Sequence, residues 1–175
     1  MLAPLSLLIH LSAASALAQP VSLIDDGGFE RHSMDLALDY ACALDAKVFH
    51  SGKRSLRITV APPGPGGTSG GGGSWTITDF EPGATYTVSA WAKPQEVAHN
   101  EGKPGYAFLA MYQYDQFGDY AAYHDFAQPV GATDWTRYTY TFTVTPETKR
   151  LVIPFGLFQA SGTLWVDDFT LVRGE

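Results

Sequence analysis

The sequence predicts an all-β protein built as an antiparallel β-sandwich. Several segments alternate polar and apolar side chains with a period of two, which places one face of a strand against a core. Turn residues separate these segments, and no stretch shows a convincing helical period. Strands that recur in this way along a chain of 175 residues are typical of two sheets packed in one domain.

Seven segments carry the strand pattern and are bounded by residues that favour turns. In chain order they are Ser55–Val60, Trp75–Phe80, Thr85–Lys93, Tyr106–Tyr114, Thr136–Val144, Arg150–Phe158 and Thr163–Val172. Alternation within Thr85–Lys93 places Tyr86 and Val88 on one face and Trp91 on the other. The segment Ser33–Ala46 follows neither the strand period nor the helix period, so no element is assigned to it.

A glycine-rich stretch, Pro62–Ser74, interrupts the strand pattern. Glycine loses much backbone freedom when it is ordered, so we expect this stretch to be a mobile loop between two strands. No lysine follows it and no helix begins there, which excludes a phosphate-binding loop. If the loop overhangs a binding face, its mobility would allow it to close over a ligand.

The first residues have the composition of an export signal. Met1–Pro20 contains no charged side chain, Leu5–Leu11 is mostly apolar, and the segment ends in Ala16-Leu17-Ala18. Small residues in this spacing are typical of a signal-peptide cleavage site. We therefore predict a signal peptide over residues 1–18 and one secreted domain over 19–175, extracellular or periplasmic. The alternative is a buried N-terminal strand or helix.

Charge and cysteine content exclude several classes of protein. The formal net charge of −7 and the absence of a basic run argue against nucleic acid and anionic membrane as partners. The single cysteine, Cys42, excludes an internal disulfide and a cysteine-based zinc site. Neutral ligands fit this composition better, and we expect a monomer.

Four segments in a fixed order carry a resemblance to a known family. They are Asp25–Glu30, His50–Arg57, Pro82–Lys93 and Leu164–Leu171. Together they resemble the carbohydrate-binding modules of the family 4, 9 and 22 type, which are galactose-binding-like jelly rolls. The likeness covers nearly the whole chain after the leader. It implies a jelly roll that binds a polysaccharide or oligosaccharide without cleaving it.

The resemblance also implies a structural calcium ion. Its ligands would be the carbonyl of Gly28, the carboxylate of Glu30, a carbonyl near Lys53 and one carboxylate of Asp167-Asp168. Calcium prefers oxygen ligands of this kind, and an aspartate in an apolar closing strand needs a partner. In the alternative, Glu30 or Asp167 accepts backbone hydrogen bonds, or Arg54 or Arg57 pairs with one of them.

Aromatic side chains are the candidates for sugar contact, because sugar rings stack their C–H faces on flat rings and hydrogen-bond at their edges. Alternation places Phe108, Tyr112 and Tyr114 on one face of their strand and Leu109, Met111 and Gln113 on the other. The resemblance favours aromatics near Trp75 and Tyr112. The predicted ligand-binding residues are Trp75, Trp91, Tyr112, Gln113, Tyr114, Asp115 and Tyr123, with Gln116 and Asp125 as further polar partners. The segment Asp115–Asp125 is expected to be a polar loop that carries Tyr120 and Tyr123.

Two other functions remain open at this point. A jelly-roll polysaccharide lyase would use Tyr123 and His124 as base and acid, with an arginine to neutralise the uronate. A glycoside hydrolase would instead need a pair of carboxylates, for which Asp115, Asp119 and Asp125 are the candidates. The sequence shows neither a nucleophile elbow nor a zinc-binding helix motif. A protein-binding adhesion module would use the same sandwich, and a flat apolar patch in place of a concave groove would favour it.

Overall fold

The computed structural model describes residues 21–31, 33, 35–63 and 69–174 of the chain. The predicted signal peptide, residues 1–18, lies outside the described residues. Within the described part every regular element is a strand. No helix there is long and apolar enough to cross a membrane.

Ten strands form the fold. They are β1 (Leu36–Leu38), β2 (Cys42–Asp45), β3 (Ser55–Val60), β4 (Gly70–Ile77), β5 (Thr85–His99), β6 (Tyr106–Tyr114), β7 (Tyr120–Ala127), β8 (Thr136–Thr143), β9 (Arg150–Phe158) and β10 (Ala160–Arg173). Three of the predicted strands, now β3, β6 and β9, have the predicted bounds. The strands predicted over Thr85–Lys93, Thr136–Val144 and Thr163–Val172 correspond to β5, β8 and β10.

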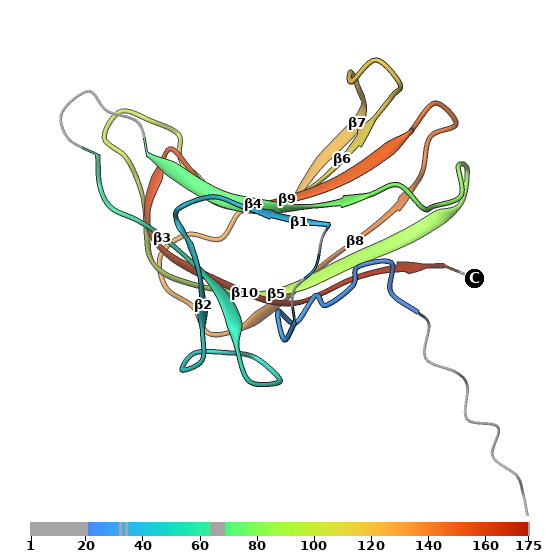
Figure 1. The fold of residues 1–175 in the computed structure, drawn as a ribbon. Helices are drawn as coiled ribbons and strands as arrows, with labels where there is room; N and C mark the ends of the chain where they lie inside the picture. The colour runs from blue at the N-terminus through green and yellow to red at the C-terminus, as the bar shows by residue number, and fades with distance from the viewer. Residues whose placement is uncertain (1–20, 32, 34, 64–68, 175) are drawn as a thin grey trace, which may run out of the picture.

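The strands build two five-stranded sheets, and every neighbouring pair runs antiparallel. One sheet has the order β1-β4-β9-β6-β7 and the other the order β2-β3-β10-β5-β8. We call them the upper and lower sheets, after their places in Figure 1. The upper sheet bends so that its outer face is concave, with the β6–β7 hairpin rising at one side (Figure 1). The predicted antiparallel sandwich is confirmed.

Alternation along the strands fills the space between the sheets. Leu109 and Met111 on β6 point inward and are buried, whereas Tyr112 and Tyr114 point outward, as the sequence predicts. The largest fully buried side chains include Trp75, Phe155 and Phe169, whose rings pack against one another. The core therefore uses one face of each sheet and leaves the other face available.

Two predicted loops are wrong. Strand β4 begins at Gly70, so the second part of the glycine-rich stretch is a strand paired with β9. Glycine is required there because a Cβ on Gly72 would overlap the Phe155 carbonyl oxygen of the neighbouring strand. The polar segment predicted as a loop over Asp115–Asp125 contains most of β7. The unassigned segment Ser33–Ala46 supplies the short edge strands β1 and β2.

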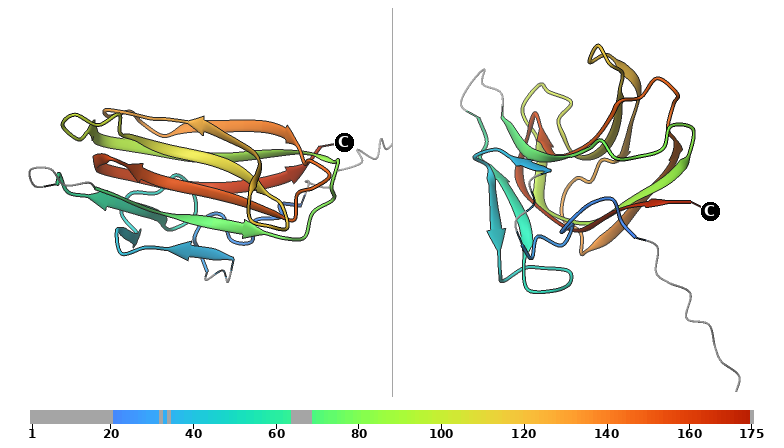
Figure 2. Two further views of the ribbon diagram at one scale, coloured as in Figure 1. Left: turned by 90° about the horizontal axis from the view of Figure 1, so that it is seen from above. Right: turned by 45° about the vertical axis from the view of Figure 1, so that its right-hand side comes forward.

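The first described residues are tied to the last strand. Ser22 forms a bridge with Val172, and the Leu23 N–H donates to the Leu171 carbonyl at 2.8 Å. This segment lies along the end of β10, close to the C-terminus of the chain (Figure 2). The lower sheet is thus extended at that end by the start of the domain.

Candidate functional site

The outer face of the upper sheet carries a band of aromatic side chains. Register places Tyr112 opposite Tyr123 and Tyr114 opposite Tyr120 across β6 and β7, and Tyr106 opposite Phe158 across β6 and β9. Since paired residues share a face of the sheet, these rings gather on one surface. We call it the aromatic face; its members are Tyr106, Phe108, Tyr112, Tyr114, Tyr120, Tyr123 and Phe158.

The tyrosines of the aromatic face support one another mainly through edge contacts. Ring centroids lie 5.4 Å apart for Tyr112 and Tyr120 and 6.2 Å apart for Tyr112 and Tyr123, with both pairs nearly perpendicular. The guanidinium of Arg150 lies 4.7 Å from the centre of the Tyr114 ring. Burial raises the pKa of Tyr112, and burial with the hydrogen bond to Tyr120 raises the pKa of Tyr114 to about 12. Their phenols therefore stay neutral and can both donate and accept hydrogen bonds at ordinary pH.

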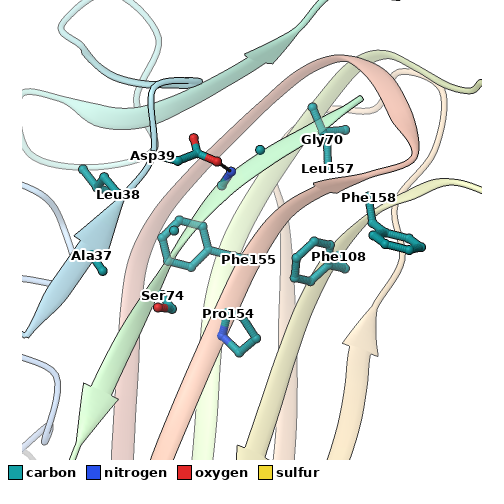
Figure 3. A pocket seen from close by; sticks show the side chains of 13 residues that line it. Ala37, Leu38, Asp39, Gly70, Ser74, Phe108, Pro154, Phe155, Leu157 and Phe158 are labelled. Carbon is teal, nitrogen blue, oxygen red and sulfur yellow. Dashed lines mark hydrogen bonds between the residues drawn. The ribbon is translucent and has the colours of Figure 1, made fainter. Parts of the chain in front are cut away.

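A hollow of about 600 Å³ lies beside the aromatic face. Its floor is the glycine run Gly70–Gly73 of β4, where no side chain rises from the sheet. Leu38 and Asp39 stand on one side and Phe108 and Phe158 on the other (Figure 3). The hollow therefore crosses the strands from β1 towards β6 and offers a largely apolar trough with one aromatic wall.

The Asp39 carboxylate at the edge of the hollow is held by the backbone. One oxygen accepts the Gly72 N–H at 2.8 Å (Figure 3). The other accepts the Ala41 N–H at 2.8 Å. These bonds fix the corner between β1 and β2 against β4. Asp39 thus positions the wall of the hollow.

A smaller pocket of about 200 Å³ adjoins the hollow and shares Phe108 and Phe158 with it. Tyr106, Tyr112 and Asp125 complete its lining. One Asp125 oxygen accepts the Gln128 side-chain amide at 3.1 Å, and the Tyr106 hydroxyl lies 3.5 Å from the same oxygen. We call this the Asp125 pocket. It places a carboxylate among four aromatic rings at one end of the trough.

A family model described as a carbohydrate binding domain matches residues 21–161. The chain belongs to this family. No curated protein sequence matches it. The resemblance drawn from the four sequence segments is thereby confirmed.

Solved structures share the fold of this carbohydrate-binding domain at low identity. The family 22 xylan-binding domain of Paenibacillus barcinonensis Xyn10C matches with a TM-score of 0.60 and 18% identity, over 90% of this chain and 97% of that one. TmCBM61, solved with β-1,4-galactotriose, matches with a TM-score of 0.60 and 16% identity, over 88% and 99%. Tailspike protein 4 of bacteriophage CBA120 matches with a TM-score of 0.63 and 19% identity over 87% of this chain, which spans 21% of the tailspike chain.

Three of the predicted sugar-contacting residues lie on the aromatic face of the carbohydrate-binding domain. They are Tyr112, Tyr114 and Tyr123, and Tyr123 is 70% exposed. Sequence analysis also named Asp125 as a polar partner, and it lines the small pocket. It missed Phe108 and Phe158 as walls, although alternation in β6 and β9 puts both on the outer face.

The prediction that Trp75 is an exposed platform is wrong. Trp75 is fully buried on the inner face of β4, where its ring packs against Phe29 and Phe169. The register of β4 decides the direction of the Trp75 ring, because Trp75 is paired with the inward-facing Ile153 of β9. Trp75 therefore belongs to the core between the two sheets.

The prediction that Gln113 contacts ligand is also wrong, whereas for Asp115 the structure shows only that one carboxylate oxygen belongs to a turn. Gln113 is buried, and its side-chain oxygen accepts the Thr145 N–H and the Thr148 hydroxyl, each at 2.8 Å. It therefore fixes the connection between β8 and β9. Asp115 accepts the Phe117 and Asp119 N–H groups at 2.8 and 3.0 Å, so its carboxylate closes the β6–β7 turn.

Trp91 points outward, as alternation in β5 predicts, but it lies on the lower sheet. The His50 ring stacks on it with centroids 3.8 Å apart, and Trp135 approaches His50 edge-on at 5.8 Å. The hollow and the aromatic face belong to the upper sheet. The structure therefore does not bring Trp91 together with Tyr112 and Tyr114.

Tyr123 and His124 do not form an acid–base pair. They are neighbours in β7, so their side chains point to opposite faces of the sheet. Tyr123 joins the aromatic face, while His124 stacks on Tyr140 of the lower sheet with centroids 4.1 Å apart. The geometry does not support the lyase hypothesis built on these two residues.

The predicted calcium ligands come together where the segment after Asp25 meets β10. Asp167 is fully buried, and one carboxylate oxygen accepts the His50 N–H at 2.8 Å and the Ser51 N–H at 3.2 Å. A Cβ on Gly28 would lie 3.5 Å from an Asp168 oxygen and 3.9 Å from an Asp167 oxygen. The same position is 3.9 Å from the Glu30 side chain, so the first and last segments converge here.

Backbone groups already engage Glu30, as the metal-free alternative expects. One oxygen accepts the Lys53 N–H at 2.6 Å and the Arg54 N–H at 3.1 Å. The hydrogen bond from Lys53 is the main cause that lowers the pKa of Glu30. The Arg54 guanidinium lies 4.0 Å from the other oxygen. Glu30 therefore stays ionised and links the first segment to the turn before β3.

The carboxylate oxygens at this position are of the chemical type that calcium prefers. Burial and the nearby charge of Asp168 raise the pKa of Asp167 to about 6, which marks a carboxylate that a cation would stabilise. Over the described residues, no three His, Cys, Asp or Glu side chains converge closely enough to hold a metal. A cation here would need backbone carbonyls, such as those of Gly28 and Lys53, which calcium accepts readily.

Proposed function

We propose that this carbohydrate-binding domain holds a glycan chain in the hollow and along the aromatic face of the upper sheet, without cleaving it. The observation that carries the proposal is the combination of a glycine floor with an aromatic wall on a concave sheet. A protein-binding module would instead need a flat apolar patch. The concave form of the surface therefore favours a glycan.

The chemistry of this surface matches that of a sugar chain. Phe108 and Phe158 offer apolar ring faces to sugar C–H groups, while the phenols of Tyr106 and Tyr112 offer hydroxyls to the sugar edges. The floor, at Gly70–Gly73, allows a flat chain to lie close to the backbone. The trough extends over the outer face of the upper sheet, which suits a run of several sugar units.

The relatives support a polysaccharide or oligosaccharide as ligand. One similar structure is described as xylan-binding and another was solved with β-1,4-galactotriose. The absence of a paired acid and base at Tyr123 and His124 favours binding without catalysis. We therefore propose a β-linked plant-type or microbial polysaccharide as the ligand class for this domain.

The test is a binding screen in which each hit is also assayed for product. The domain is incubated with soluble and insoluble polysaccharides, and bound protein, reducing ends and unsaturated products are measured. Binding without product supports the proposal. Release of product, or failure to bind any glycan, overturns it.

A pair of variants locates the site once a ligand is found. Tyr112→Ala removes a ring of the aromatic face and should weaken binding at least tenfold, since buried aromatic anchors dominate such interfaces. Trp91→Phe changes an outward aromatic on the lower sheet while keeping a ring for His50 to stack on, and should leave the affinity unchanged. Titration calorimetry on both variants, with melting curves as a check on folding, decides between the two sheets. A loss confined to Trp91→Phe would place the site on the lower sheet.

We also propose that calcium binds between Gly28, Glu30, Lys53, Asp167 and Asp168 and ties the first segment of the domain to β10. The support is the buried Asp167 carboxylate and the convergence of Gly28, Glu30 and Asp168 around it. The role would be structural, because this position belongs to the lower sheet and the hollow to the upper sheet.

Export of the domain is proposed from the leader alone. Residues 1–18 combine an apolar stretch with a small-residue cleavage site. Expression of the whole chain with a C-terminal tag, followed by mass spectrometry of the exported protein, tests this proposal. A mature N-terminus at Gln19 supports it, and a chain that is retained inside the cell with Met1 intact contradicts it.

A further inference from the structure

The Asp125 pocket contains a carboxylate that forms no ion pair with any cationic side chain in the described part of the chain. Four of the five residues lining the pocket are aromatic, and Asp125 is the only charged one. Asp125 takes part in none of the ion pairs formed within the described residues. A partly buried carboxylate without a cationic partner is unfavourable and attracts a positive ligand group.

Hydrogen bonds inside the domain satisfy Asp125 only in part. The Gln128 amide donates to one oxygen at 3.1 Å, and the Tyr106 hydroxyl lies at the 3.5 Å limit from the same oxygen. By contrast, Asp39 at the far edge of the hollow receives backbone N–H groups on both oxygens. Within the described residues, one Asp125 oxygen therefore receives no hydrogen bond and can meet a ligand, whereas both oxygens of Asp39 are used by the fold.

The rings around Asp125 add to the attraction for a positive group. Burial raises the pKa of Tyr106 and Tyr112, and the negative charge of Asp125 raises both further. Aromatic faces attract cations, and the attraction increases where water is partly excluded. The aromatic rings and the Asp125 carboxylate therefore both favour a positively charged group in the pocket.

We propose that the Asp125 pocket selects a sugar unit that carries a free amine, such as a glucosamine residue of a β-1,4-linked chain. This inference rests on the proposed function and names the substrate class of the same site. The pocket volume of about 200 Å³ suits a single sugar unit, below the 300–1,000 Å³ typical of larger ligands. The ammonium group would donate charge-assisted hydrogen bonds to Asp125 while the sugar ring lies against Phe108 or Phe158.

The experiment compares three tetrasaccharides with the same β-1,4 backbone that differ at the second carbon of each ring. Glucosamine tetramer carries ammonium groups, glucose tetramer carries hydroxyls and N-acetylglucosamine tetramer carries neutral amides. Calorimetry is run at a pH where the amines are protonated. The glucosamine tetramer should bind about tenfold more tightly than either neutral tetramer, as expected for one added charge-assisted hydrogen bond.

Two variants separate the pocket from the general negative charge of the protein. Asp125→Asn removes the charge in the pocket and should abolish the preference for the amine. Glu147→Gln removes one charge from the exposed β8–β9 turn and should leave the preference intact. Unchanged melting temperatures verify that both variants fold.

The outcomes are distinguishable from those of the proposed function. A preference for the amine that falls equally in both variants would mean diffuse attraction to an acidic protein and would overturn the inference. Equal or tighter binding of a neutral tetramer, or no binding of the glucosamine tetramer, would also overturn it. The wider polysaccharide screen decides the proposed function separately, because any neutral glycan bound there keeps that proposal standing.

Discussion

The outer faces of the two sheets have similar strand geometry but very different chemistry. Across β5 and β8 the lower sheet pairs hydroxyls: Thr85 with Thr143 at 3.2 Å and Thr87 with Thr141 at 2.8 Å. Across β6 and β7 the upper sheet instead pairs tyrosines, for example Tyr112 with Tyr123. One face satisfies its polar groups internally, and the other leaves aromatic rings open to solvent.

The difference shows how a β-sandwich can place stabilising contacts on one sheet and a ligand-binding surface on the other. Small hydroxyl side chains bond to each other across β5 and β8, so this part of the lower sheet presents little that a ligand can use. The lower sheet instead receives the candidate calcium position and the bridge from Ser22 to Val172. On the upper sheet, rings and bare glycine backbone form a trough. We infer that stabilising contacts gather on the lower sheet and ligand-binding residues on the outer face of the upper sheet.

The largest effect is expected from Trp75→Ala, which tests whether the direction of a ring decides its role. Trp75 points into the core beneath the hollow, and its removal should lower the free energy of unfolding by about 3–5 kcal/mol. Tyr112→Ala, on the outer face of the same sheet, should cost about 1 kcal/mol or less. Urea unfolding measures both. Equal destabilisation by the two variants would break the separation between inner and outer faces.

Calcium removal is expected to have the next largest effect and tests whether the lower sheet carries stability alone. Chelation by EDTA should lower the Tm by roughly 5–10 °C, the shift expected from losing a ligand held at about a hundred times its Kd. Glycan affinity should not change. Asp167→Asn should abolish the calcium-dependent part of the Tm, and an unchanged Tm after chelation of the parent domain would contradict the metal proposal.

The raised pKa of Asp167 gives this prediction a pH dependence. Its value in the folded state is about 6, against an ordinary 3.8, so the folded domain keeps the proton that the unfolded chain releases. In EDTA the stability should therefore fall as pH rises from about 4 to 6 and then level off. Calcium should reduce that fall, because it binds the ionised carboxylate. Melting curves across this pH range, with and without calcium, measure the difference.

The smallest effect is expected from the hydroxyl pairs of the lower sheet. Thr87→Val, Thr141→Val and the double variant should each change the free energy of unfolding by less than about 1 kcal/mol, because an exposed cross-strand pair contributes roughly 0.2–1 kcal/mol. Glycan affinity should stay the same in all three. A double-mutant cycle measures the coupling, and any loss of binding would show that the lower sheet takes part in recognition.

The sequence predicts most of the scaffold and part of the site. Alternation assigned Tyr112 and Tyr114 to the outer face and Leu109 and Met111 to the core, because β6 is a long strand with an uninterrupted period. The same rule placed Gln113 on the inner face, although the residue was also named as a ligand contact. Its amide proves to bind Thr145 and Thr148 instead.

The remaining errors have physical causes. Trp75 follows a run of glycines, which have no side chains whose alternation could show which way the strand faces. The direction of its ring is set by the register between β4 and β9, which is known only from the folded sheet. Strand β7 was missed because its neighbours Asp115 and Asp119 form the turn that begins the hairpin. The role of Asp125 depends on which hydrogen-bond donors and cationic side chains lie near it in space. Positions along the sequence do not show these neighbours.

The glycine floor has a consequence for how a ligand would be held. Side chains that become ordered on binding each cost about 0.5–1.5 kcal/mol of conformational entropy. Residues Gly70–Gly73 have no rotamers to lose, and the pairing of β4 with β1 and β9 already fixes their backbone. A chain lying on this surface would meet a base that is rigid before it arrives, so differences in affinity between glycans should originate at the walls.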